Sequence, residues 1–137
     1  MIADCLLDTN VLVYAVDSTP GNERKREISI GLLESLDFGV SAQVLQEFYV
    51  TVTRKLEQPL APRMAVQFVQ RLSLFPVVAI DADLVSEGIL CSLVSRISYW
   101  DGAIIAAAQR LEAAILYSED LSHGQVYSSV EVVNPYL

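Results

Sequence analysis

The stretch IADCLLDTNVLVYAV, residues 2–16, sets the pattern of the whole chain, because it joins a buried strand directly to a helix. Residues 2–7 are an apolar run of strand length, and residues 10–16 form a short helix that the preceding polar residues cap. The same alternation of short apolar runs and longer helical segments continues to the end of the chain. It predicts further strands at 38–41, 76–80, 113–118 and 130–134, and further helices at 22–36, 42–56, 62–74, 81–95 and 99–112.

Strands that alternate with helices indicate an α/β fold with a parallel sheet covered on both faces. We therefore predict a three-layer α/β/α arrangement around a central five-stranded parallel sheet. The length of 137 residues and the 53% hydrophobic composition are typical of one globular domain, and we expect residues 1–137 to form it.

The composition also bears on location and partners. No apolar run is long enough to span a membrane, and the first residues lack the basic region and cleavage site of a secretory signal. Two cysteines without a metal-like spacing, Cys5 and Cys91, are typical of reduced thiols, so we expect a cytoplasmic protein without a membrane partner. The net charge of −8 excludes nucleic-acid binding by overall charge alone; a polyanion would need a local basic patch or metal ions.

Two aspartates follow predicted strands, at the sheet edge where open parallel sheets place their sites. Asp8 ends the first strand in LLDTN, and Asp120 lies just past the fourth in LYSEDLSHG. Each also has a purely structural interpretation. Asp8 is a suitable helix N-cap, and Asp120 is a suitable turn residue that bonds its own backbone.

Two further acids lie on predicted helices. Glu47 is at the edge of an apolar stripe, where a solvated residue paired with Arg54 is an equally simple explanation. Asp101 shares a helical face with Ile104, Ile105 and Ala108, which places a carboxylate on the face that the helix buries. Ser98 is three residues earlier and could compensate Asp101 locally through a capping box. Otherwise we expect Asp101 to be buried toward a shared metal site.

A shared cation explains the four acids together. Mg²⁺ and Mn²⁺ prefer carboxylate oxygens and water, and clustered carboxylates repel one another until a cation lies between them. Neutral side chains beside the acids, namely Thr9, Asn10 and Ser118, would hold the acids or a bound water in place.

The ordered acidic motifs resemble the PIN-domain family, and most of all the VapC-type ribonuclease toxins of toxin–antitoxin pairs. The resemblance is carried by LLDTNVLVYA (6–15), SAQVLQEFYVTVTRK (41–55), SYWDGAIIAAA (98–108) and ILYSEDLSHGQ (115–125). It implies an endoribonuclease that hydrolyses RNA phosphodiester bonds with water activated by one or two Mg²⁺ or Mn²⁺ ions. It also implies that Asp8, Glu47, Asp101 and Asp120 are the catalytic and metal-binding acids, supported by Asn10 and Ser118.

The resemblance further implies an antitoxin protein as partner and a homodimer. The RNA substrate would have to be held by basic side chains close to the site. The candidates, each of which is also compatible with a solvated helix face, are Arg24, Lys25, Arg26, Arg54, Lys55 and Arg63.

Two other functions remain open at this point. A catalytically silent PIN-like domain that binds a protein would have the same fold. A phosphatase or dehalogenase would use Asp8 as a covalent nucleophile, but Asn10 occupies the position where a second acid is usual.

Overall fold

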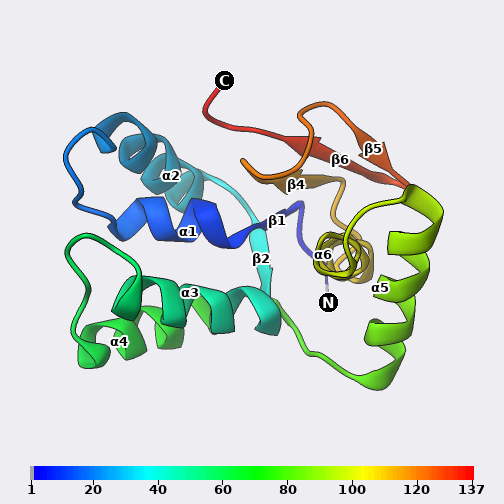
Figure 1. Cartoon of the computed structure of the whole chain (residues 1–137), viewed down its shortest axis with the longest axis horizontal. Coiled ribbons are helices and arrows are strands. Elements are labelled where there is room, and N and C mark those ends of the chain that lie inside the picture. The colour runs from blue at the N-terminus through cyan, green and yellow to red at the C-terminus, as the bar shows by residue number, and fades with distance from the viewer. Residues whose placement is uncertain (1) are drawn as a thin grey trace.

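The structure, a computed structural model, describes residues 2–137 as six helices around a six-stranded sheet in the order β3-β2-β1-β4-β6-β5 (Figure 1). The strands are β1 (Cys5–Leu7), β2 (Phe38–Ser41), β3 (Val77–Val78), β4 (Ile115–Tyr117), β5 (Val126–Tyr127) and β6 (Val130–Val133). The helices are α1 (Thr9–Val16), α2 (Glu23–Ser35), α3 (Ala42–Arg54), α4 (Pro62–Leu72), α5 (Ala82–Ser95) and α6 (Tyr99–Arg110).

The predicted α/β fold is confirmed, with one addition to the sheet. The five predicted strands are present and mutually parallel, although most are shorter than predicted. The sixth strand, β5, is antiparallel to β6 and forms a hairpin with it. It escaped prediction because it has only two residues, of which Val126 is exposed, so it lacks the apolar run that marked the other strands.

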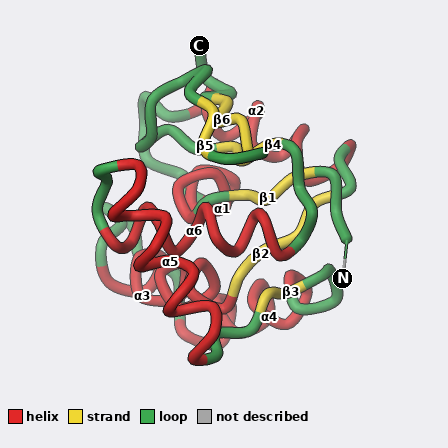
Figure 2. The backbone as a smooth tube through the Cα atoms, turned by 90° about the vertical axis from the view of Figure 1, so that its right-hand side faces the viewer, coloured by secondary structure: helices red, strands yellow, loops and turns green. Residues whose placement is uncertain are grey.

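Two groups of helices flank the sheet. Figure 1 shows α1 to α4 on one side of β1 and β2, with α5 and α6 on the other. Figure 2, turned by 90°, shows β3, β2, β1, β4 and β6 following one another up the molecule, with α5 in front of them. The central strands are buried, and Leu6, Val40 and Leu116 have no exposed surface, which explains why the strands are almost continuously apolar.

The strand order changes direction at β1. The chain passes from β1 to β2 and β3 on one side of it, and then returns to β4 and β6 on the other. Such a switch point leaves a crevice beyond the carboxyl ends of the two diverging strands. Here these ends are Leu7 of β1 and Tyr117 of β4, which are paired in register, and the amide of Asp8 donates a 3.0 Å hydrogen bond to the Tyr117 carbonyl.

Helices α5 and α6 pack closely because two glycines face each other across their contact. A Cβ atom added at Gly102 would lie 2.5 Å from the carbonyl oxygen of Gly88 and 2.8 Å from the amide nitrogen of Ser92. This close approach buries α6 from Gly102 to Ala108.

No single helix among residues 2–137 is long and apolar enough to cross a membrane. Helices α5 and α6 reach that length and composition only as a pair, and the pair is bent by 116°.

Candidate active site

Asp8 is the buried centre of the crevice at the switch point. Its backbone caps α1, and one carboxylate oxygen, Oδ1, accepts a 2.7 Å hydrogen bond from the amide of Thr9. The other oxygen, Oδ2, accepts a 2.7 Å hydrogen bond from the hydroxyl of Ser118, which follows β4 and is fully buried. The N-cap interpretation of Asp8 is therefore correct, and it coexists with a place at the bottom of the crevice.

Asp120 is tied to the same place by the first turn of α1. The Asn10 side chain donates a 3.1 Å hydrogen bond through Nδ2 to Oδ2 of Asp120, and its Oδ1 accepts one from the amide of Glu119. The amide of Asp120 donates to the Ser118 hydroxyl at 3.1 Å. The hydroxyl of Ser118 therefore links the two aspartates.

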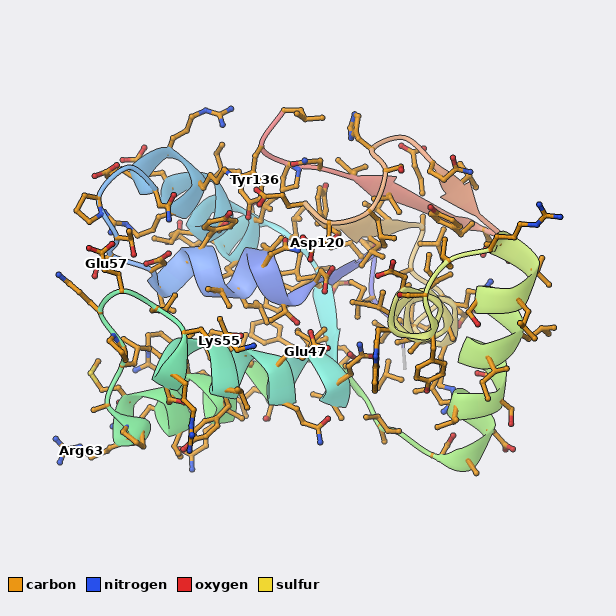
Figure 3. The ribbon with its side chains drawn as sticks, viewed as in Figure 1. Glu47, Lys55, Glu57, Arg63, Asp120 and Tyr136 are labelled. Atoms are coloured by element: carbon orange, nitrogen blue, oxygen red, sulfur yellow. The ribbon has the colours of Figure 1, made fainter. Side chains whose placement is uncertain are left out.

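Glu47 reaches the crevice from α3. Its Oε2 accepts a 2.8 Å hydrogen bond from the hydroxyl of Thr9, and Gln43, one turn earlier, donates to its Oε1 at 3.1 Å. Figure 3 shows Glu47 and Asp120 approaching the start of α1 from opposite sides. The pairing of Glu47 with Arg54 considered from the sequence is not formed among the described residues.

Asp101 is placed less deeply than the sequence suggested. It is half-buried in the first turn of α6, and its amide donates a 3.1 Å hydrogen bond to the hydroxyl of Ser98, which caps the helix. The structure therefore shows partial burial of Asp101 in the first turn of α6, and its place in a shared metal site stays a prediction. Within residues 2–137 no hydrogen bond joins Asp101 to the other three acids.

The charge of Asp8 is poorly compensated in the folded chain. Burial is the main reason that the pKa of Asp8 rises from 3.8 to about 6; hydrogen bonds from Ser118 and Thr9 oppose this rise, and the negative charges of Asp120 and Glu47 add to it. The nearest ion pair, between Lys25 and Glu119 at 2.7 Å, does not include any of these three acids. The crevice therefore concentrates negative charge without a neutralising side chain.

This charge makes the stability of the metal-free protein depend on pH. Because the folded chain holds the Asp8 proton more tightly than the unfolded chain, this contribution to stability is complete below pH about 4 and is lost as the pH rises to about 6. The expected loss in the free energy of unfolding is about 3 kcal/mol. Urea unfolding in EDTA from pH about 3 to pH about 8, which lie outside both pKa values, measures it. An equal fall in an Asp8→Asn variant would show that other groups cause the change.

The donors at the crevice have the chemistry that a hard divalent cation requires. Carboxylate oxygens of Asp8, Asp120 and Glu47, with the neutral oxygens of Thr9 and Ser118, are ligands that Mg²⁺ and Mn²⁺ prefer. Among the residues that the structure describes, no three acidic, histidine or cysteine side chains already form a complete set of ligands around one point. The residues fit such a cation by donor type and charge.

A groove of about 720 Å³ leads away from the acids between α1 and α3. Its walls include the supporting residues Thr9 and Asn10, and three residues that the sequence analysis missed: Tyr14, Asp17 and Glu119. The signal for Tyr14 and Asp17 was available, because they lie four and seven positions after Asn10 and so continue the same helical face.

The six basic residues that were predicted as candidates for RNA binding make different contacts in the structure. Lys25 binds Glu119, and the guanidinium groups of Arg24 and Arg26 donate to the backbone carbonyls of Tyr136 and Asp17. Arg54 is exposed on α3 and does not line the groove. Arg63 is the second residue of α4 and points away from the groove in Figure 3. Lys55 alone among the six lines the groove.

Comparisons with known proteins agree with this fold. Three solved structures superpose over most of the chain. A toxin–antitoxin complex from Klebsiella pneumoniae has a TM-score of 0.71, with 20% identity over 96% of this chain and 98% of that one. FitAB bound to a DNA fragment has a TM-score of 0.71, with 24% identity over 97% and 96%. VapC20 of Mycobacterium tuberculosis, a sarcin–ricin loop cleaving toxin, has a TM-score of 0.63, with 18% identity over 85% and 89%.

These identities show a shared fold. A search of curated proteins by sequence gives no significant match. The family model of the PIN domain matches residues 5–128, which include β1, all six helices and the acids described above. The chain belongs to the PIN-domain family.

Proposed function

We propose that the chain is a metal-dependent endoribonuclease, the toxin of a toxin–antitoxin pair, which hydrolyses RNA phosphodiester bonds. The observation that carries the proposal is the buried Asp8 at the switch point of a PIN fold, with Asp120 and Glu47 close enough to raise its pKa further. A site that gathers uncompensated carboxylates at the end of a sheet is suited to a divalent cation and unsuited to an unaided RNA phosphate.

The side chains of the site would have three different roles. Asp8, Glu47, Asp101 and Asp120 would hold Mg²⁺ or Mn²⁺, which supplies a Lewis acid for the phosphate and an activated water when bound. Ser118 and Asn10 orient the two aspartates through the hydrogen bonds described above. Thr9 holds Glu47 against α1.

The partners follow from the same proposal. One of the superposed structures is described as a toxin–antitoxin complex, and another as FitAB bound to DNA. An antitoxin protein that blocks the crevice, a cytoplasmic location and a homodimer are accordingly part of the proposal.

The test is cleavage of a panel of structured and single-stranded RNAs in Mg²⁺, Mn²⁺ or EDTA, with Asp120→Asn as the variant. We expect cleavage that requires metal and falls by about 100-fold or more in the variant, because loss even of groups that only support ligands costs about 10- to 100-fold. Asp83→Asn is the matched control, since Asp83 is exposed on α5, outside the groove, and loses the same charge.

Metal binding measured by calorimetry tests the four-acid site separately. Mg²⁺ or Mn²⁺ affinity that is unchanged in the Asp8→Asn/Asp101→Asn double variant would overturn it. Absence of both metal binding and cleavage would favour the silent protein-binding domain, and a phosphoryl group trapped on Asp8 would favour the phosphatase.

A further inference from the structure

The groove between α1 and α3 has a different chemical character at each end. Thr9, Glu47 and Asp120 line it beside the carboxylates, and Lys55 lines the other end. Glu47 and Lys55 lie eight residues apart on α3, which corresponds to about 12 Å along the helix. Figure 3 shows both on the side of α3 that faces α1.

Hydrogen bonds between the two walls hold the groove at both ends. The hydroxyl of Thr9 donates to Glu47 at the acidic end, and the hydroxyl of Ser18, after α1, donates to Oε1 of Gln58, after α3, at 3.0 Å. The middle of the groove is lined by Val13, Tyr14 and Val50, which give it an apolar and aromatic section. Two further acids line the groove, but their carboxylates already accept hydrogen bonds: Asp17 from Thr19 and Asn22, and Glu119 from Tyr14 and Lys25.

Tyr14 is held firmly in this middle section. Its hydroxyl donates a 2.8 Å hydrogen bond to Glu119, and its ring contacts Tyr136 edge to face at a centroid distance of 5.2 Å. The Lys25 amino group lies 4.9 Å from the centre of the ring and is itself bound to Glu119. An aromatic side chain fixed in this way loses little conformational freedom when a flat ligand packs on it.

Among the six candidate basic residues, Lys55 is the one that lines the groove, and its charge is free. Its amino group makes no hydrogen bond or ion pair with any of residues 2–137, whereas the Lys25 amino group is taken up by Glu119 and Tyr14. A free ammonium group at the end of an otherwise acidic groove attracts an anionic group to that end.

We propose that the groove binds a single-stranded RNA next to the cleaved bond, with Lys55 on a phosphate group removed from the scissile one and Tyr14 under an intervening base. The inference rests on the proposed function and adds to it a subsite on each of the two groove walls. Stacking on an aromatic ring and a phosphate contact are both tolerant of sequence, so this subsite favours unpaired strands over duplexes without choosing a base.

The experiment compares the kcat/KM of Lys55→Met and Arg54→Met on a pool of random-sequence single-stranded RNA and on random dinucleotides, in Mn²⁺. The two variants lose the same charge at neighbouring exposed positions of α3 and its end, but only Lys55 lines the groove. For Lys55→Met we expect about a five-fold loss on the long strands, a salt slope smaller by about 0.7, and little change on dinucleotides. Arg54→Met should stay close to wild type on both.

Tyr14 is tested with two variants on the same substrates. Tyr14→Leu should lose about five-fold or more on the long strands, because a stacked base is lost. Tyr14→Phe keeps the ring and should stay close to wild type, which separates stacking from the hydrogen bond to Glu119.

The outcomes distinguish the subsite from the nuclease. Long-strand cleavage that falls equally in Lys55→Met and Arg54→Met, or equally on long strands and dinucleotides, would overturn the subsite and leave the nuclease intact. A wild-type protein that cleaves none of the strands with either metal would overturn both.

Discussion

An Asp8→Asn variant is expected to lose RNA cleavage and, at the same time, to become more stable than the wild-type protein in the absence of metal. Cleavage should fall by more than about 100-fold, because Asp8 would be a direct ligand and loss of a supporting group already costs about 10- to 100-fold. Stability should rise because the pKa of Asp8 is about 6, so that at pH 7.5 the folded wild-type protein contains a buried negative charge. The neutral asparagine side chain removes this charge.

The expected gain in the free energy of unfolding is about 1–3 kcal/mol, the upper value being the full effect of the raised pKa. Asparagine keeps an oxygen to accept the hydrogen bond from the Thr9 amide, and the Ser118 hydroxyl can reorient to accept from the new amide group. Urea unfolding at pH 7.5 in EDTA, with the cleavage assay run in parallel, measures both effects.

Asp17 provides a control of opposite sign. It is also buried, at the other end of α1, and burial alone would raise its pKa, but hydrogen bonds from Thr19 and Asn22 reverse the effect and lower the pKa. Asp17→Asn should therefore destabilise the fold. If both variants lost stability, the charge of Asp8 would be compensated in a way that contradicts the electrostatics described here.

Replacing Gly102 by alanine is expected to be the most damaging glycine-to-alanine change among residues 2–137. The added Cβ would lie 2.5 Å from the Gly88 carbonyl oxygen and 2.8 Å from the Ser92 amide nitrogen. Both atoms belong to the backbone of α5, so relief requires the helices to separate. We expect a loss of about 2–3 kcal/mol in the free energy of unfolding, at the upper end of the range for overpacked cores.

Gly31→Ala is the matched control for this prediction. Gly31 lies on α2, and nothing is within 4 Å of the position of its added Cβ. Alanine is favoured over glycine inside a helix, so this variant should gain about 0.5–1 kcal/mol. Similar urea midpoints for the two variants would mean that the contact between α5 and α6 can accommodate the added methyl group without loss of stability.

The sequence was sufficient to predict most of the fold because its strands are buried on both faces. Runs such as IADCLL and AAILYS have no competing helical periodicity, and polar caps such as Asp8 and Ser98 mark where the helices begin. The order of strands across the sheet is a different matter. It depends on which apolar faces pack together, and the spacing along the chain does not encode this.

The candidate site was predictable to the extent that it consists of strand ends. Asp8, Ser118 and Asp120 follow neighbouring parallel strands, and the register of Leu7 with Tyr117 brings them together. The depth of Asp101 was not predictable, because a helical wheel gives direction but not distance from the open end of the helix. Glu119 was missed because its role depends on Tyr14 and Lys25, which approach it only in the folded chain.

The hydrogen bond between Ser118 and Asp8 joins positions 110 residues apart, and this separation has a consequence during protein synthesis. A chain that leaves the ribosome N-terminus first carries Asp8 and Glu47 early, but β4 must emerge and pair with β1 before Ser118 and Asp120 reach them. A polypeptide whose translation stops before β4 therefore has half of the crevice and lacks the hydrogen bond from Ser118 to Asp8. Any activity of this site is therefore acquired only after β4 and the residues up to Asp120 have been made.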